Sequence, residues 1–148
     1  MFYVITKDVV NKAIDIVNHG WTQGEGGDTY SEGYPAFRME RPVSTEAHTA
    51  LAALQRAVGA RLYTTQKGWY TKSNYEGFSN RKAVDALALD WAMRHGLSFD
   101  QSGVRGLERL NNAAENKATV INFLKYLAGR VSNTGFVDTS GVKYKKVA

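Results

Sequence analysis

The stretch "KDVVNKAIDIVNHGWTQGEGG" (residues 7–27) contains the pattern that decides the fold class. Val10, Ala13, Ile14 and Val17 recur at the i, i+3, i+4, i+7 spacing of one helix face, which predicts an amphipathic helix over residues 7–19. The pattern stops at "NHG", where we expect Gly20 to end the helix in a left-handed conformation. A long glycine-rich loop is predicted over residues 20–43, and loops of this length are often functional.

The same periodicity recurs along the chain and predicts a mainly α protein of about five helices. The second helix contains Ala47, is capped by Ser44 and ends at Gly59, and the third runs from Ser79 or Asn80 to His95. The fourth begins with the capping box "SFDQ" (98–101) and carries Val104, Leu107 and Leu110, but Gly103 and Gly106 weaken it. The fifth covers residues 116–128. Residues 60–78 hold a short hairpin or an irregular excursion. Turn residues in "FVDTSGVKYKKVA" favour a small C-terminal β-hairpin.

Composition predicts one globular domain over residues 1–148, with a basic tail at 142–148. The chain is 43% hydrophobic and 22% charged, as is common for folded proteins. It contains no cysteine, so disulfide scaffolds, zinc fingers and thiol nucleophiles are excluded. No apolar run approaches the length of a membrane span and no secretion signal is recognised, so we expect a cytoplasmic protein that engages no membrane. No cofactor is predicted.

The glycine-rich loop does not fit a phosphate-binding loop. "GEGGDT" (24–29) lacks the third glycine of a dinucleotide motif, carries two acidic residues and follows the negative end of a helix. The histidines do not have metal-ligand spacing. His19 and His95 each precede a glycine at a helix end, so we expect both to cap exposed carbonyls, and we expect His48 to lie on the surface of the second helix.

"FVDTSG" (136–141) resembles the active-site turn of aspartic proteases. That chemistry needs two such aspartates, each followed by a β-rich lobe, whereas only seven residues follow Gly141. We therefore predict a hairpin turn here. No catalytic residue is assigned, and the sequence favours a protein that is not an enzyme.

The strongest binding candidate is a basic, aromatic segment with a net charge of +4, from five cationic residues against Glu76 over residues 61–82. Its candidate contact residues are Arg61, Tyr63, Lys67, Trp69, Tyr70, Lys72, Tyr75, Arg81 and Lys82. Aromatic rings can stack on bases while cations neutralise phosphates, and Trp, Tyr and Arg also dominate protein–protein contacts. The alternative is that the rings complete the core and the charges are simply solvated.

The chain also resembles an uncharacterised family of small helical proteins from actinobacteria and their phages, a domain of unknown function. The resemblance rests on "GWTQG" (Gly20, Trp21, Thr22, Gln23 and Gly24) and on "LNN" (110–112), where Asn111 matches the asparagine of the family's late Trp-Asn-Asp motif. Leu110 replaces the tryptophan and Asn112 the aspartate. The resemblance implies a small helical, phage-like intracellular protein and no particular activity. Trp21 is expected to fill the core, and Gln23 to bond the loop backbone.

Three functions are open on this reading. The first is a non-catalytic binding protein that engages a host macromolecule through the basic, aromatic segment. The second is a nucleic-acid-binding module that uses the same segment and the lysines of the tail. The third is a small-ligand binder or enzyme with a pocket between the 20–43 loop and the Asn111/Asn112 region.

Overall fold

The computed structural model describes residues 3–23, 47–59, 77–97 and 106–142 with their side chains, and residues 62–67 and 70–75 as two strands. In chain order the elements are α1 (Lys7–His19), α2 (Ala50–Val58), β1 (Leu62–Lys67), β2 (Tyr70–Tyr75), α3 (Arg81–Arg94), α4 (Gly106–Ala113) and α5 (Lys117–Ala128). The predicted mainly α fold is confirmed. No helix in the described ranges is both long and apolar enough to cross a membrane.

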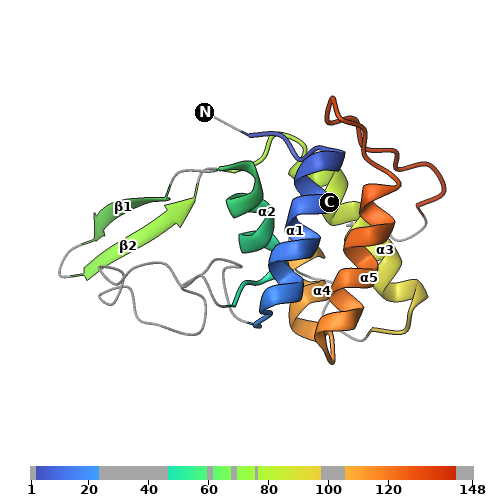
Figure 1. Ribbon diagram of the computed structural model, residues 1–148, viewed down its shortest axis with the longest axis horizontal. Helices are drawn as coiled ribbons and strands as arrows, with labels where there is room; N and C mark the ends of the chain where they lie inside the picture. Colours follow the sequence, from blue (N-terminus) through green and yellow to red (C-terminus); the bar gives the residue numbers. More distant parts are fainter. Residues whose placement is uncertain are drawn as a thin grey trace.

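Helix α1 lies between α2 and α5 at the centre of the helical body (Figure 1). Its predicted apolar face is correct, since Val10, Ala13 and Val17 are fully buried. The hydroxyl oxygen of Thr6 accepts a hydrogen bond from the Val9 amide and so caps the helix at its N-terminus. Packing on both sides explains why this helix forms although it is only 13 residues long.

Helix α2 begins later than the sequence pattern predicts. Its N-cap is Thr49, whose side chain accepts from the Ala52 amide, and residues 47–49 are not helical. Placing Ala47 and His48 in the helix is therefore wrong, and Ser44 lies outside the described residues. The predicted end is confirmed, because Gly59 has a φ of 76° in the left-handed region.

Helices α3 and α4 approach each other very closely. A Cβ on Gly106 would lie 2.2 Å from the carbonyl oxygen of Asp85, so only glycine fits at this crossing. The Asp85 carboxylate accepts from the Leu107 amide, and Arg81 bridges Asp85 and Glu108. Gly106, predicted to weaken the fourth helix, is the residue that lets it pack. The capping box at 98–101 and Val104 lie outside the described residues.

The third and fifth helices match their predicted ends. Asn80 is the N-cap of α3, but its side chain makes no capping bond; it instead pairs with both backbone groups of Ile5 and donates to the Gly135 carbonyl. Asn116 caps α5 by accepting from the Thr119 amide. Asn80 thus ties the N-terminal segment and the loop after α5 to the start of α3.

The segment after α5 forms two turns. Val131 and Val137 make an isolated antiparallel bridge, and the Asp138 carboxylate accepts from the amide and hydroxyl of Ser140. A turn is present in "FVDTSG", where the Val142 amide donates to the Thr139 carbonyl, but within the described residues Val137 pairs with Val131 upstream of the turn and not across it. Residues 143–148, which would complete the predicted C-terminal hairpin, lie outside the described residues.

Strands β1 and β2 form an antiparallel hairpin, one of the two alternatives predicted for residues 60–78. Figure 1 shows this hairpin extending away from the helices, and its strands contact mainly each other. The hydrophobic core lies instead among the helices, around Phe123, Leu54, Leu87 and Leu107.

Candidate functional site

The backbone at the end of α1 does not turn as predicted. Gly20 has φ −177° and ψ 126°, an extended conformation open to any residue, so the expected left-handed glycine is wrong. The chain runs on as a short strand-like segment beside His48: the His48 amide donates to the Gly20 carbonyl, and the Thr22 amide donates to the His48 carbonyl. Pairing with residues distant in the sequence, rather than a local turn, ends α1.

Asn111 joins three segments through one buried side chain. Its carboxamide oxygen accepts from the indole Nε1 of Trp21 at 2.8 Å and from the Ala50 amide at 2.9 Å. Its Nδ2 donates to the Thr22 carbonyl at 3.1 Å. The side chain is 1% exposed, so these partners replace water almost completely. Asn111 therefore fixes α4 to the start of α2 and to the segment after α1.

The side chain of Gln23 donates to backbone carbonyls at the C-terminal end of α4. Its Nε2 lies 2.7 Å from the Ala114 carbonyl oxygen, 3.0 Å from that of Asn112 and 3.4 Å from that of Asn111. The final carbonyls of a helix lack partners within the helix, and Gln23 supplies a donor for them. The predicted bond from Gln23 to the backbone of its own loop concerns residues 24–43, which lie outside the described residues.

The family-like motif is therefore brought together in space. We call Trp21, Thr22, Gln23 and Asn111 the polar corner, because these residues bond one another and the adjacent backbone. Trp21 packs against the core but is only half-buried, so it does not fill the core as predicted. Gly20 lies beside them, and Gly24 lies outside the described residues. The hydrogen bonds of the polar corner are made to other protein groups, so these residues connect α4 to α2 and to the segment after α1.

His48 was predicted to be a surface residue, and this is wrong. Its side chain is 2% exposed, and neither ring nitrogen has a hydrogen-bond partner among the described residues. Burial, assisted by the positive charge of Arg56, lowers the pKa of His48 to about 4. The backbone hydrogen bonds of His48 to Gly20 and Thr22 hold His48 in the interior. Helical periodicity in the sequence does not predict such hydrogen bonds between distant segments.

His19 and His95 behave as predicted. Each ring places Nδ1 2.8 Å from the carbonyl oxygen four residues earlier, Asp15 for His19 and Trp91 for His95. A carbonyl can only accept, so Nδ1 donates in both bonds. Both histidines cap helix ends, and neither takes part in a cluster of metal ligands; no group of three or more such side chains occurs in the part of the chain that the structure describes.

The basic, aromatic residues divide between the hairpin and α3. The register pairs Tyr63 with Asn74, Thr65 with Lys72 and Lys67 with Tyr70. Paired residues of antiparallel strands share a face, so this register assigns four candidate contact residues to one face, Tyr63, Lys67, Tyr70 and Lys72, and Tyr75 to the other.

The remaining candidates have different surroundings. Arg81 is held in the ion pairs with Asp85 and Glu108, the latter at 2.5 Å, and so serves the contact between α3 and α4. Lys82 is exposed at the start of α3. Arg61, Trp69 and the lysines of the C-terminal tail lie outside the described residues.

Comparison of the chain with models of known protein families, with curated proteins and with solved structures finds no match.

Proposed function

We propose that this protein is a non-catalytic binding protein and that its β1–β2 hairpin contacts a macromolecular partner. The observation that carries this proposal is the placement of the hairpin: its strands extend away from the helical body and contact mainly each other (Figure 1). Residues that completed the core would instead pack between helices. A projecting two-stranded ribbon is a shape that can enter a groove or a concave surface of a partner.

The residues on the hairpin suit such a contact. The register gathers two lysines and two tyrosines on one face, and Tyr and cationic residues are effective in both protein and nucleic-acid interfaces. The cysteine-free composition supports a cytoplasmic setting, that of the host if the protein is phage-encoded. The polar corner supports a structural role for the family-like motif and leaves the binding role to the hairpin.

Capture of partners from a native lysate by the tagged full-length protein tests the proposal. Samples with and without nuclease separate the two partner classes: recovery that survives nuclease indicates a protein, and recovery that nuclease abolishes indicates nucleic acid. Absence of any specific partner under both conditions would contradict the proposal.

Nucleic acid is the second candidate partner, because lysine and tyrosine share one face of the ribbon. If the segment neutralises about four phosphates, a fourfold increase in salt lowers the affinity roughly a hundredfold. Fluorescence anisotropy with single- and double-stranded oligonucleotides at low and high salt measures this slope. Absent or salt-independent binding would remove nucleic acid as the partner.

A further inference from the structure

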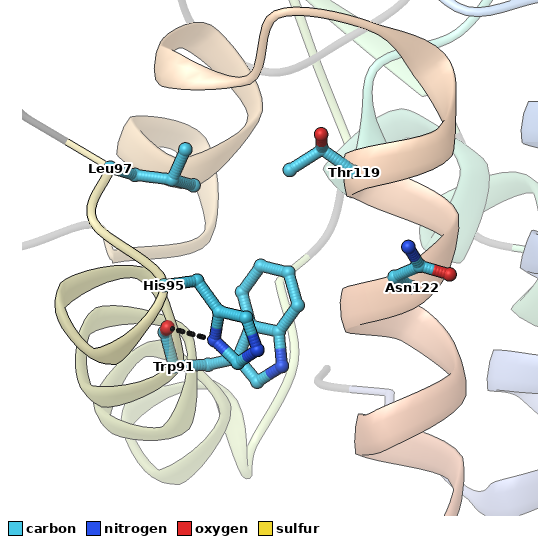
Figure 2. Close-up of a pocket in the computed structure, with 5 residues that line it drawn as sticks. All are labelled: Trp91, His95, Leu97, Thr119 and Asn122. Carbon is cyan, nitrogen blue, oxygen red and sulfur yellow. Dashed lines mark hydrogen bonds between the residues drawn. The ribbon is translucent and has the colours of Figure 1, made fainter.

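A cleft of about 470 Å³ opens beside the C-terminal end of α3, away from the polar corner and the hairpin. Figure 2 shows Trp91, His95 and Leu97 on one side of it, and Thr119 and Asn122 of α5 on the other. Its volume is within the range of small-molecule sites.

The aromatic side of the cleft is fixed in place. The rings of Trp91 and His95 stack with centroids 4.0 Å apart and 22° between their planes, and Trp91 also meets the edge of Phe123 at 5.7 Å. The bond from Nδ1 of His95 to the Trp91 carbonyl sets the orientation of the imidazole. Because Nδ1 carries the hydrogen, Nε2 of the neutral ring is an acceptor, and it lies on the side of the ring that faces α5 (Figure 2).

The opposite side presents polar groups from one helix face. Thr119 and Asn122 are three residues apart on α5, which places them on adjacent turns of the same face. The carboxamide of Asn122 is exposed and offers a donor next to an acceptor. Amide side chains of this kind bind the paired donor and acceptor at the edge of a heteroaromatic base, as asparagine does with adenine.

The described residues that line the cleft carry no formal charge when His95 is neutral. Among them a charged ligand would find no counter-charge, whereas a flat, uncharged ring could stack on the imidazole and hydrogen-bond to α5. We propose that this cleft binds an uncharged planar heteroaromatic ligand of the nucleobase class, stacked on His95, with its donor and acceptor edge on Asn122. This binding site is additional to the proposed function of the hairpin.

Isothermal titration of the full-length protein with adenosine tests the proposal, with ribose as the probe that lacks a base. We expect adenosine to bind and ribose not to bind. Asn122→Leu removes the edge contact and is expected to weaken adenosine binding roughly tenfold, the value of one good bidentate pair. Asn11→Ala, an exposed asparagine on α1, is the matched control and should change nothing.

Three results would overturn the proposal: no adenosine binding at millimolar concentration, equal binding of ribose, or full affinity in Asn122→Leu. Melting temperatures of all variants verify folding, and we expect them to stay at the wild-type value because Asn122 is exposed. Reversal of the hairpin charges in Lys67→Glu/Lys72→Glu should leave adenosine binding unchanged. That variant separates failure of the cleft from failure of the hairpin.

Discussion

Replacement of Asn111 by alanine tests the structural role of the polar corner. The change removes the carboxamide that serves Trp21, Thr22 and Ala50 and leaves all three partners without their hydrogen bonds. Because the site is almost fully buried, water cannot freely take the place of the side chain.

The loss of stability in Asn111→Ala depends on how deeply each hydrogen-bond partner of Asn111 is buried. A buried donor or acceptor that loses its partner costs about 1–3 kcal/mol. The Ala50 amide is fully buried and belongs at the upper part of this range, whereas Trp21 and Thr22 are half-buried and regain part of the loss from water. We therefore expect Asn111→Ala to lower the free energy of unfolding by about 4 kcal/mol. That is a large share of the roughly 5–15 kcal/mol that stabilises a typical domain.

Equilibrium urea denaturation followed by tryptophan fluorescence measures this loss. Asn111→Asp keeps an acceptor for Trp21 and Ala50 but sets a carboxylate oxygen against the Thr22 carbonyl and buries a charge, so it should not recover the stability that the alanine variant loses. The matched control is Asn11→Ala, which is exposed on α1 and should shift stability by less than about 0.5 kcal/mol. A loss below about 1 kcal/mol in Asn111→Ala would refute the reasoning that the corner holds the fold together.

Three further predictions concern stability. Gly106→Ala places a methyl group 2.2 Å from the Asp85 carbonyl oxygen. The overpacking should lower the free energy of unfolding by about 3 kcal/mol, although alanine has the better helix propensity. An unchanged free energy of unfolding in chemical denaturation would disprove the close approach of α3 and α4. The pKa of His48 is about 4 in the folded protein and 6.5 in the unfolded chain, so the unfolded chain takes up the proton first as pH falls. Stability should drop by about 3 kcal/mol between pH 7 and pH 4, and the dependence should be shallower in His48→Leu; parallel pH curves for the two proteins would argue against a buried neutral His48. Thr6→Ala removes the cap on the Val9 amide and should cost about 1 kcal/mol, with an unchanged midpoint of unfolding as the contrary result.

Local patterns predicted the helices well, because each helix carries its own apolar face and its own end signals. The faces of α1 and α5 and the stop at Gly59 depend on neighbours within a few residues. The same logic predicted the histidine caps, since a ring four residues after a carbonyl reaches it within one helix.

Features set by contacts between distant segments could not be predicted in this way. Helical periodicity extended α2 over His48, whereas the bridge between residues 20–22 and residue 48 holds that position in a strand-like conformation. The same bridge makes Gly20 extended. The ion pair of Arg81 with Glu108 likewise depends on the approach of α3 and α4. The sequence alone therefore predicts that Arg81 is available to a binding partner, whereas the structure pairs it with Glu108.

The sequence predicted some residues of the candidate sites and not others. The sequence patterns "GWTQG" and "LNN" singled out Asn111 together with Trp21 and Gln23, but only the structure shows that they bond one another. The cleft beside His95 was missed, because its two sides come from α3 and α5 and no sequence motif joins them.

The most direct test of the central claim compares two charge-reversal variants in the same binding assay. Lys67→Glu/Lys72→Glu changes the hairpin, and Lys12→Glu/Lys125→Glu makes the same change in charge at exposed positions of α1 and α5. We expect the hairpin variant to lose its partner while melting at the temperature of the wild type, and the control variant to keep its partner. Undiminished partner recovery by a folded hairpin variant, or equal loss in both variants, would contradict the claim that the hairpin is the contact.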